Sequence, residues 1–91
     1  MMSVRRAERR ERRNEMKDLL YYIVANLVDC PDEIQIDEIE KESETVLELR
    51  VAKDDMGKVI GRQGRIAKEI RTIIRSAANR ADRRVSVEII G

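Results

Sequence analysis

The residues best suited to chemistry lie in one short stretch, residues 59–66, where two glycines bracket two polar side chains. Gly61 can end a helix in a left-handed conformation, and Gly64 lets a ligand backbone lie close to the start of the next helix. Free N–H groups at a helix start favour anions, and Arg62 and Arg65 add positive charge on both sides of the same point. The stretch therefore predicts binding of a phosphate that belongs to a larger molecule.

Two glycines three residues apart occur in many proteins, so a plain helix–turn–helix joint without a ligand is the competing interpretation. The surrounding residues favour the ligand, because two aliphatic residues precede the first glycine and the loop itself is basic. Isoleucines continue after the second glycine at helical spacing: Ile66, Ile70, Ile73 and Ile74.

Hydrophobic spacing predicts the elements that position this loop. Apolar residues recur at three- and four-residue steps over residues 16–28, which is typical of an amphipathic helix. A short helix over residues 56–60 leads into the loop, and a longer one follows it to about Asn79 or Arg80. Apolar and polar residues alternate, as in half-buried strands, in three segments: 34–37, 47–51 and 85–89. This order, helix, strand, strand, helix, helix, strand, predicts an α+β domain with three helices on one face of a three-stranded sheet.

Residue type and helical angle predict how the two helices beside the loop are oriented. Asp54 or Asp55 is expected to cap the short helix, since Asp is favoured at the N-terminal end. In the long helix the isoleucines fall on one side and are expected to face the core. Lys68, Arg71 and Arg75 fall on the other side, where a solvated surface and contact with a ligand are both open.

Charge and composition narrow the class of ligand. Residues 29–55 carry eleven acidic and three basic side chains, whereas residues 56–91 carry nine basic and three acidic ones, so a net charge of +1 conceals a basic C-terminal half. Such a half suits a polyanion. The chain has no Phe or Trp and two Tyr, which argues against the aromatic stacking surfaces of RRM or cold-shock domains.

Composition offers little support for an enzyme or a metal site. There is no histidine, and the single cysteine, Cys30, is expected to be a small buried or half-buried residue. We find no nucleophile and base pair and no nucleotide-hydrolysis motif. We therefore expect no enzymatic activity, no cofactor, no metal and no small-molecule substrate. No apolar run approaches a membrane span and no signal peptide is evident, so we expect no membrane contact and a cytoplasmic location.

The first fifteen residues differ from the rest, and we expect a basic, flexible extension at residues 1–15 and one folded domain at residues 16–91. Residues 1–14 hold six Arg and two Glu without an apolar stripe. A solvated helix supported by Glu8 and Arg12, and an arm that binds the ligand, are the alternatives. Met16 is also a candidate initiator.

The loop and its flanks resemble the KH domain, whose GXXG loop clamps four nucleotides of single-stranded nucleic acid. The match covers the aliphatic positions as well as the glycines, in Val-Ile-Gly-x-x-Gly-x-Ile followed by Ile70. A helix and a strand precede the core unit, which is the order of the bacterial type II KH domain. The resemblance covers residues 16–91.

Within that class the chain is similar to the bacterial KhpA family, formerly grouped under the YlqC name. The similarity includes Met-Lys-Asp-Leu-Leu from Met16 and Asp-Cys-Pro-Asp-Glu-Ile from Asp29, and is most specific over residues 55–71. It implies a single-stranded RNA-binding protein, an RNA chaperone and post-transcriptional regulator. It also implies pairing with a second KH protein, KhpB, or a homodimer, and an influence on cell elongation and peptidoglycan homeostasis. The Arg-rich segment before Met16 departs from the family.

The same resemblance implies the residues of the site. Residues 61–64 are expected to clamp phosphate with Lys58 on the approach and Arg65 nearby, while Val59 and Ile60 are candidates either for an apolar groove wall or for the core. An acidic loop at residues 40–44 would repel phosphate if it bordered the groove. The predicted RNA-binding residues are Lys58, Val59, Ile60, Gly61, Arg62, Gln63, Gly64 and Arg65.

A dimerisation module is the alternative function, in which the partner makes most RNA contacts. A chain of 91 residues has a small core and is stabilised by a partner. Apolar residues expected to be exposed at Ile39 or Ile90 motivate this alternative.

Overall fold

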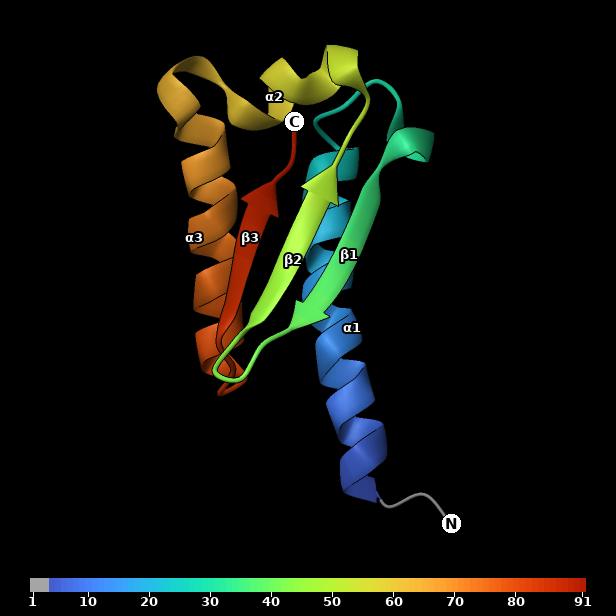
Figure 1. Ribbon diagram of the computed structural model, residues 1–91, viewed down its shortest axis with the longest axis vertical. Coiled ribbons are helices and arrows are strands. Elements are labelled where there is room, and N and C mark those ends of the chain that lie inside the picture. The colour runs from blue at the N-terminus through green and yellow to red at the C-terminus, as the bar shows by residue number, and fades with distance from the viewer. Residues whose placement is uncertain (1–3) are drawn as a thin grey trace.

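The order of elements predicted from the sequence is confirmed in a computed structural model, which describes the backbone of residues 4–91 and the side chains of residues 15–91 (Figure 1). The helices and strands are α1 (Val4–Ala25), β1 (Gln35–Glu40), β2 (Thr45–Arg50), α2 (Met56–Ile60), α3 (Arg65–Arg80) and β3 (Val85–Ile89). Single turns of 3₁₀ helix cover Pro31–Glu33, Lys53–Asp55 and Arg62–Gly64.

Among the described residues the sheet has three strands, with β2 in the centre. β1 runs antiparallel to β2, with Ile36 opposite Leu49, and β3 runs parallel to β2, with Leu47 opposite Val87. A parallel pair needs a crossover, and α2 and α3 supply it. The glycine loop therefore lies within the segment that carries the chain from β2 to β3.

α1 and α3 cover one face of the sheet, and α2 lies at one end of this helical layer (Figure 1). Side chains alternate along each strand, so every second residue meets the helices. The central apolar core residues are 2% exposed or less: Leu20, Val24, Leu47, Leu49, Val59, Ile70, Ile74 and Ala78. This aliphatic layer fixes α3, and with it the loop at its first turn.

The opposite face of the sheet is not covered by a described helix and carries acidic side chains (Figure 1). Asp37, Glu48 and Glu88 lie opposite one another across the three strands, and alternation places them away from the buried Leu47 and Leu49. Arg50 pairs with Asp37 at 3.0 Å. A polyanion is therefore disfavoured on this face.

Two expectations about exposure are wrong. Ile73 is 45% exposed, because α1 and the sheet cover only the side of α3 that carries Ile70 and Ile74. Cys30 is exposed, because it lies in the turn between α1 and β1. Partial desolvation and the neighbouring Asp55 carboxylate raise the pKa of the Cys30 thiol.

The N-terminal boundary differs from the predicted helix over residues 16–28, because α1 begins at Val4 and ends at Ala25. Residues 1–3, and the side chains up to residue 14, lie outside the described part of the chain. The mobility of residues 1–15 and the division at Met16 stay predictions.

Candidate nucleic-acid interface

Gly61 ends α2 and allows the chain to turn toward α3. Its N–H donates to the carbonyl of Gly57 at 2.9 Å. Its φ is 74° and its ψ is 175°, which lies in an extended, positive-φ region open essentially to glycine and not in the left-handed helical region expected from sequence. A Cβ atom here would lie 2.6 Å from Cγ1 of Ile66. Gly61 is therefore required for α2 and α3 to approach each other.

Gln63 and Gly64 form the exposed end of the turn. Both have left-handed conformations, with φ of 57° and 72°, and the Gly64 N–H donates to the carbonyl of Gly61 at 3.2 Å. A Cβ atom on Gly64 would meet no atom within 4 Å. The space beside Gly64 is thus open, as the approach of a ligand backbone requires.

The side chains around this turn carry free positive charge. Arg62 and Arg65 are exposed, and within residues 15–91 neither guanidinium has an ion-pair partner. No side chain caps the start of α3, whose N-cap is Gly64, so its first-turn N–H groups are not taken by a side-chain acceptor. These groups make the turn an electropositive point suited to a phosphate.

The two aliphatic residues before the loop separate in the structure. Val59 is fully buried and belongs to the core, whereas Ile60 is 37% exposed beside the loop. Ile60 is therefore the one of the two that can offer an apolar surface to a ligand.

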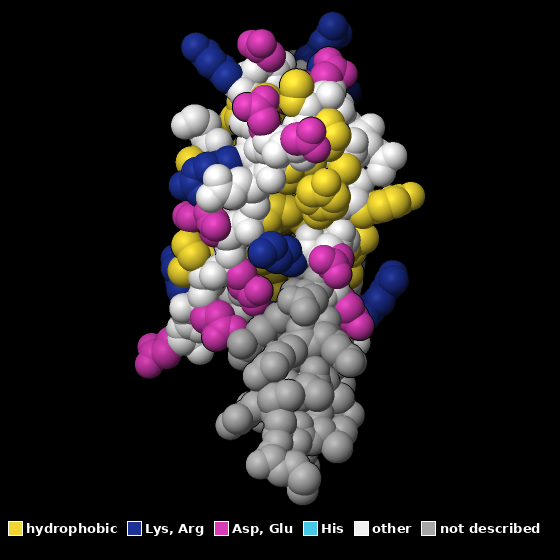
Figure 2. Space-filling model, turned by 90° about the vertical axis from the view of Figure 1, so that its right-hand side faces the viewer, with side chains coloured by type: hydrophobic (Ala, Val, Ile, Leu, Met, Phe, Trp, Pro, Cys, Tyr) yellow, Lys and Arg dark blue, Asp and Glu magenta, His cyan; other side chains and the backbone are white. Residues whose placement is uncertain are grey.

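The acidic loop at residues 40–44 lies far from this site. It joins β1 to β2 at the end of the sheet opposite α2 and the glycine turn (Figure 1). Acidic side chains also predominate on the side of the molecule that carries β1 (Figure 2). The acids of residues 40–44 are thus kept away from the glycine turn and do not oppose a phosphate there.

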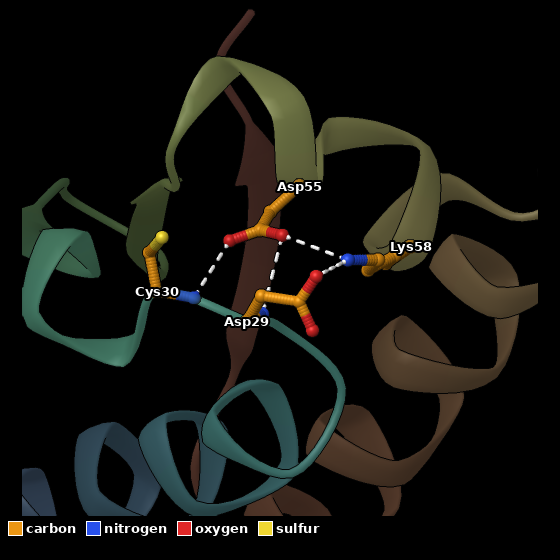
Figure 3. A network of polar contacts seen from close by, with 4 residues as sticks. All are labelled: Asp29, Cys30, Asp55 and Lys58. Carbon is orange, nitrogen blue, oxygen red and sulfur yellow. Dashed lines mark hydrogen bonds and ion pairs between the residues drawn. The ribbon is translucent and has the colours of Figure 1, made fainter.

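Lys58 takes part in a network that joins α2 to the turn after α1 (Figure 3). Its ammonium donates to Oδ1 of Asp55 at 3.2 Å and to the carboxylate of Asp29. Asp55 is 2% exposed and accepts the backbone N–H groups of Asp29 at 3.2 Å and of Cys30 at 3.0 Å. Lys58 thus lies near the loop with its charge already paired.

The expectation that Asp54 or Asp55 caps the short helix is wrong. Asp55 occupies the N-cap position of α2, yet its side chain makes no capping hydrogen bond. The carboxylate turns instead to the N–H groups of Asp29 and Cys30. It therefore joins two segments distant in sequence, which no local pattern announces.

The surroundings of Asp55 and Lys58 keep both groups charged. Burial raises the pKa of Asp55, but the two backbone N–H donors and the Lys58 ammonium outweigh it and hold the pKa below its ordinary value of 3.8. Hydrogen bonds to Asp29 and Asp55 raise the pKa of Lys58. The pair thus remains ionised at neutral pH.

This network predicts a specific dependence of stability on pH. The unfolded chain protonates Asp55 near pH 3.8, whereas the folded chain does so only at lower pH, so the stabilisation is present above pH 3.8 and is lost as pH falls through the folded pKa. We expect Asp55→Asn to lower the free energy of unfolding at neutral pH, with a deficit that shrinks in acid. Urea unfolding of both proteins across this range measures it. Parallel curves would show that Asp55 contributes no such stabilisation.

Sequence reasoning also gave no indication of the place of Arg71. Its Nε donates to the backbone carbonyl of Val87 at 3.4 Å, so the side chain crosses from α3 to β3. The carbonyl belongs to a strand with one neighbour in the described sheet. Arg71 is thus anchored between these elements and is not simply solvated.

None of the described helices has the length and apolar character needed to cross a membrane. Among the residues that the structure describes, no group of three or more His, Cys, Asp or Glu side chains is placed to hold a metal ion.

A three-stranded mixed sheet, this order of helices and a two-glycine joint between α2 and α3 define a KH domain of type II. Comparison with known families agrees, since the model of the family described as "KhpA/KhpB, KH domain" matches residues 17–89. The chain belongs to this family.

Curated relatives from several bacteria share most of the chain. A protein of Clostridium acetobutylicum is 60% identical over 75 residues, which are 82% of this chain and 100% of that protein. A Clostridium perfringens protein is 49% identical over 75 residues, which are again 82% of this chain and 100% of that protein. A Borreliella burgdorferi protein is 49% identical over 73 residues, 80% of this chain and 89% of its own. Each is named RNA-binding protein KhpA.

Proposed function

We propose that this protein binds single-stranded RNA at the turn formed by residues 61–64. The observation that carries the proposal is the open space beside Gly64, flanked by Arg62 and Arg65, which lack ion-pair partners within residues 15–91. The names of the relatives, RNA-binding protein KhpA, support it.

In this proposal the turn grips the sugar-phosphate backbone and leaves the bases free to meet neighbouring side chains. One phosphate lies in the open space beside Gly64, at the uncapped N-terminal end of α3. Arg62 and Arg65 approach it from either side. Ile60 offers its exposed aliphatic surface to a base. Val59 acts from the core by holding α2 in place, and Gln63 adds a polar side chain at the exposed end of the turn.

Lys58 contributes to the proposed site only if a phosphate replaces the Asp29 carboxylate as its partner. Its side chain is 41% exposed, and its partner Asp29 is 78% exposed, so exchange of the Asp29 carboxylate for a phosphate costs little desolvation. The contact with buried Asp55 can persist during that exchange. Lys58 is therefore proposed as a phosphate ligand that gives up one carboxylate when RNA arrives.

The finer parts of the proposal come from the resemblance to the family. They comprise a cytoplasmic RNA chaperone without enzymatic activity, acting with KhpB or as a homodimer, and an influence on cell elongation and peptidoglycan homeostasis. A pair of KH domains would also raise affinity for one RNA strand through avidity.

A surface on the side away from α3 favours the second candidate function, a protein-interaction module. Figure 2 shows an apolar patch on this side, among acidic side chains. A hollow of about 320 Å³ lies there between α1 and β1, lined by Lys17, Asp18, Tyr21, Ile34, Gln35 and Ile36. Tyr21 is 46% exposed, and Ile39 at the far end of β1 is 38% exposed. Sedimentation of the purified chain with and without RNA separates the two functions, since a monomer that binds RNA excludes dependence on a partner.

The dependence of affinity on salt provides the first test of the proposal. With two or three phosphates neutralised, a plot of log K against log salt should have a slope of about −1.5 to −2 for a single strand. Fluorescence anisotropy of a labelled octanucleotide measures it, with a duplex of the same sequence as the control. A slope near zero, or equal affinity for the duplex, contradicts binding through the turn.

A further inference from the structure

A second hollow lies on α3, next to the glycine turn but outside it. It measures about 510 Å³ and is lined by five residues of the first two and a half turns of the helix: Arg65, Lys68, Glu69, Thr72 and Ile73. Ile73 is 45% exposed on a helix whose other isoleucines are buried or half-buried. The hollow therefore has an apolar wall and a charged rim.

The rim carries both hydrogen-bond donors and hydrogen-bond acceptors that are not used within residues 15–91. The cationic ends of Arg65 and Lys68 have no hydrogen bond or ion pair within residues 15–91. The Thr72 hydroxyl donates to the carbonyl of Lys68 at 2.9 Å, so its oxygen remains an acceptor. Glu69 is exposed beside it and is a second acceptor. Cations can hold phosphate here, while the two acceptors suit the exocyclic amino group of a base.

The hollow is continuous with the turn, because Arg65 directly follows Gly64 and also lines the hollow. From Arg65 to Ile73 the helix rises about 12 Å, a span that a few nucleotides cover. A strand held at the turn thus reaches Ile73 without leaving the protein surface.

We propose that this α3 hollow is a second subsite for single-stranded RNA, which receives the nucleotides next to those held by the turn. A base that carries an amino group, such as cytosine or adenine, lies against Ile73 with its amino group toward Glu69 and Thr72. The phosphates on either side of it meet Arg65 and Lys68. The inference rests on the proposed function, because the turn fixes the strand from which the subsite is filled.

The test compares an RNA that fills the turn with one long enough to fill both subsites. Oligocytidylates of four and eight nucleotides are titrated by NMR against the wild-type chain, the double variant Lys68→Gln/Ile73→Ser and the control Arg75→Gln. Arg75 is an exposed basic residue on α3 that does not line the hollow. An octamer can bind in more overlapping positions than a tetramer, which raises its apparent affinity. This statistical factor is the same for every protein variant, so it cancels when variants are compared on the same octamer.

We expect the double variant to lose about tenfold in affinity for the octamer, as when a charge-assisted phosphate contact and an apolar contact are removed. Its affinity for the tetramer, and the affinity of Arg75→Gln for both RNAs, should stay within about twofold of wild type. An unchanged octamer affinity, or an equal loss in Arg75→Gln, overturns the subsite.

Two further results separate the subsite from its rivals. If sedimentation shows that Lys68→Gln/Ile73→Ser dissolves a wild-type dimer while octamer affinity is unchanged, the hollow is a protein interface and the subsite is overturned. If the tetramer binds the wild-type chain without shifting the amide resonances of residues 61–64, the proposed function fails. If the double variant loses affinity for the octamer but not for the tetramer, the result supports the α3 hollow as a subsite.

Discussion

Replacing Arg62 and Gln63 together with aspartate is expected to lower the affinity for single-stranded RNA by roughly 100-fold, since it removes one charge-assisted contact and sets two anions against the phosphate. The fold should persist. Both side chains are exposed, and Gln63 has a φ of 57°, a left-handed conformation that Asp tolerates better than most residues. Anisotropy titration gives the affinity, and thermal unfolding followed by circular dichroism checks the fold.

The matched control is Arg75→Asp/Ser76→Asp, which makes the same change in net charge on exposed residues of α3. If affinity follows only the overall charge, both double variants will lose it equally. A specific role of the turn requires a much larger loss in Arg62→Asp/Gln63→Asp. Undiminished binding by that folded variant would show that RNA is held elsewhere.

Replacing Gly61 with alanine is expected to cost about 3 kcal/mol or more of the free energy of unfolding, through backbone strain combined with overpacking. Its φ of 74° and ψ of 175° suit glycine alone, and the new Cβ would lie 2.9 Å or less from three side-chain atoms of Ile66. Since Ile66 packs against the core, it cannot move aside freely. Urea denaturation measures the loss.

Gly64→Ala is the control for this prediction, and its effects should be of a different kind. The added Cβ meets no protein atom within 4 Å. The cost to stability therefore comes only from holding alanine in a left-handed backbone conformation, which is about 1 kcal/mol. The methyl group would occupy the space proposed for the RNA backbone, so affinity should fall while the domain stays folded. A Gly64→Ala chain as unstable as Gly61→Ala, or one with full affinity, would contradict the different roles assigned to the two glycines.

Much of the architecture could be predicted because its signals are local. The bounds of α2 and α3 follow from the glycines between them, and the bounds of β3 follow from simple alternation. The observed bounds of the two hairpin strands differ by one or more residues from the predicted segments 34–37 and 47–51. β1 begins at Gln35 and extends to Glu40, and β2 ends at Arg50. In that region apolar and polar residues alternate beyond the hydrogen-bonded ladder, so pattern alone does not fix the ends.

The rest depends on contacts between distant segments. Asp55 meets backbone groups 25 and 26 residues away, and neither a capping motif nor a charge count distinguishes that use from a helix cap. Val59 and Ile60 are both aliphatic neighbours of the loop, and only the packing of α2 places one in the core and the other at the surface. Ile73 fits the apolar face of a helical wheel, yet it lies beyond the width that α1 and the sheet cover.

The central claim is that the backbone of residues 61–64 holds the sugar-phosphate chain. Titration of the ¹⁵N-labelled protein with a short single-stranded RNA, followed by amide chemical shifts, tests it most directly. We predict that the amide resonances of these four residues shift most strongly and saturate together. Four unmoved amides, with shifts appearing elsewhere on the protein, would contradict the claim.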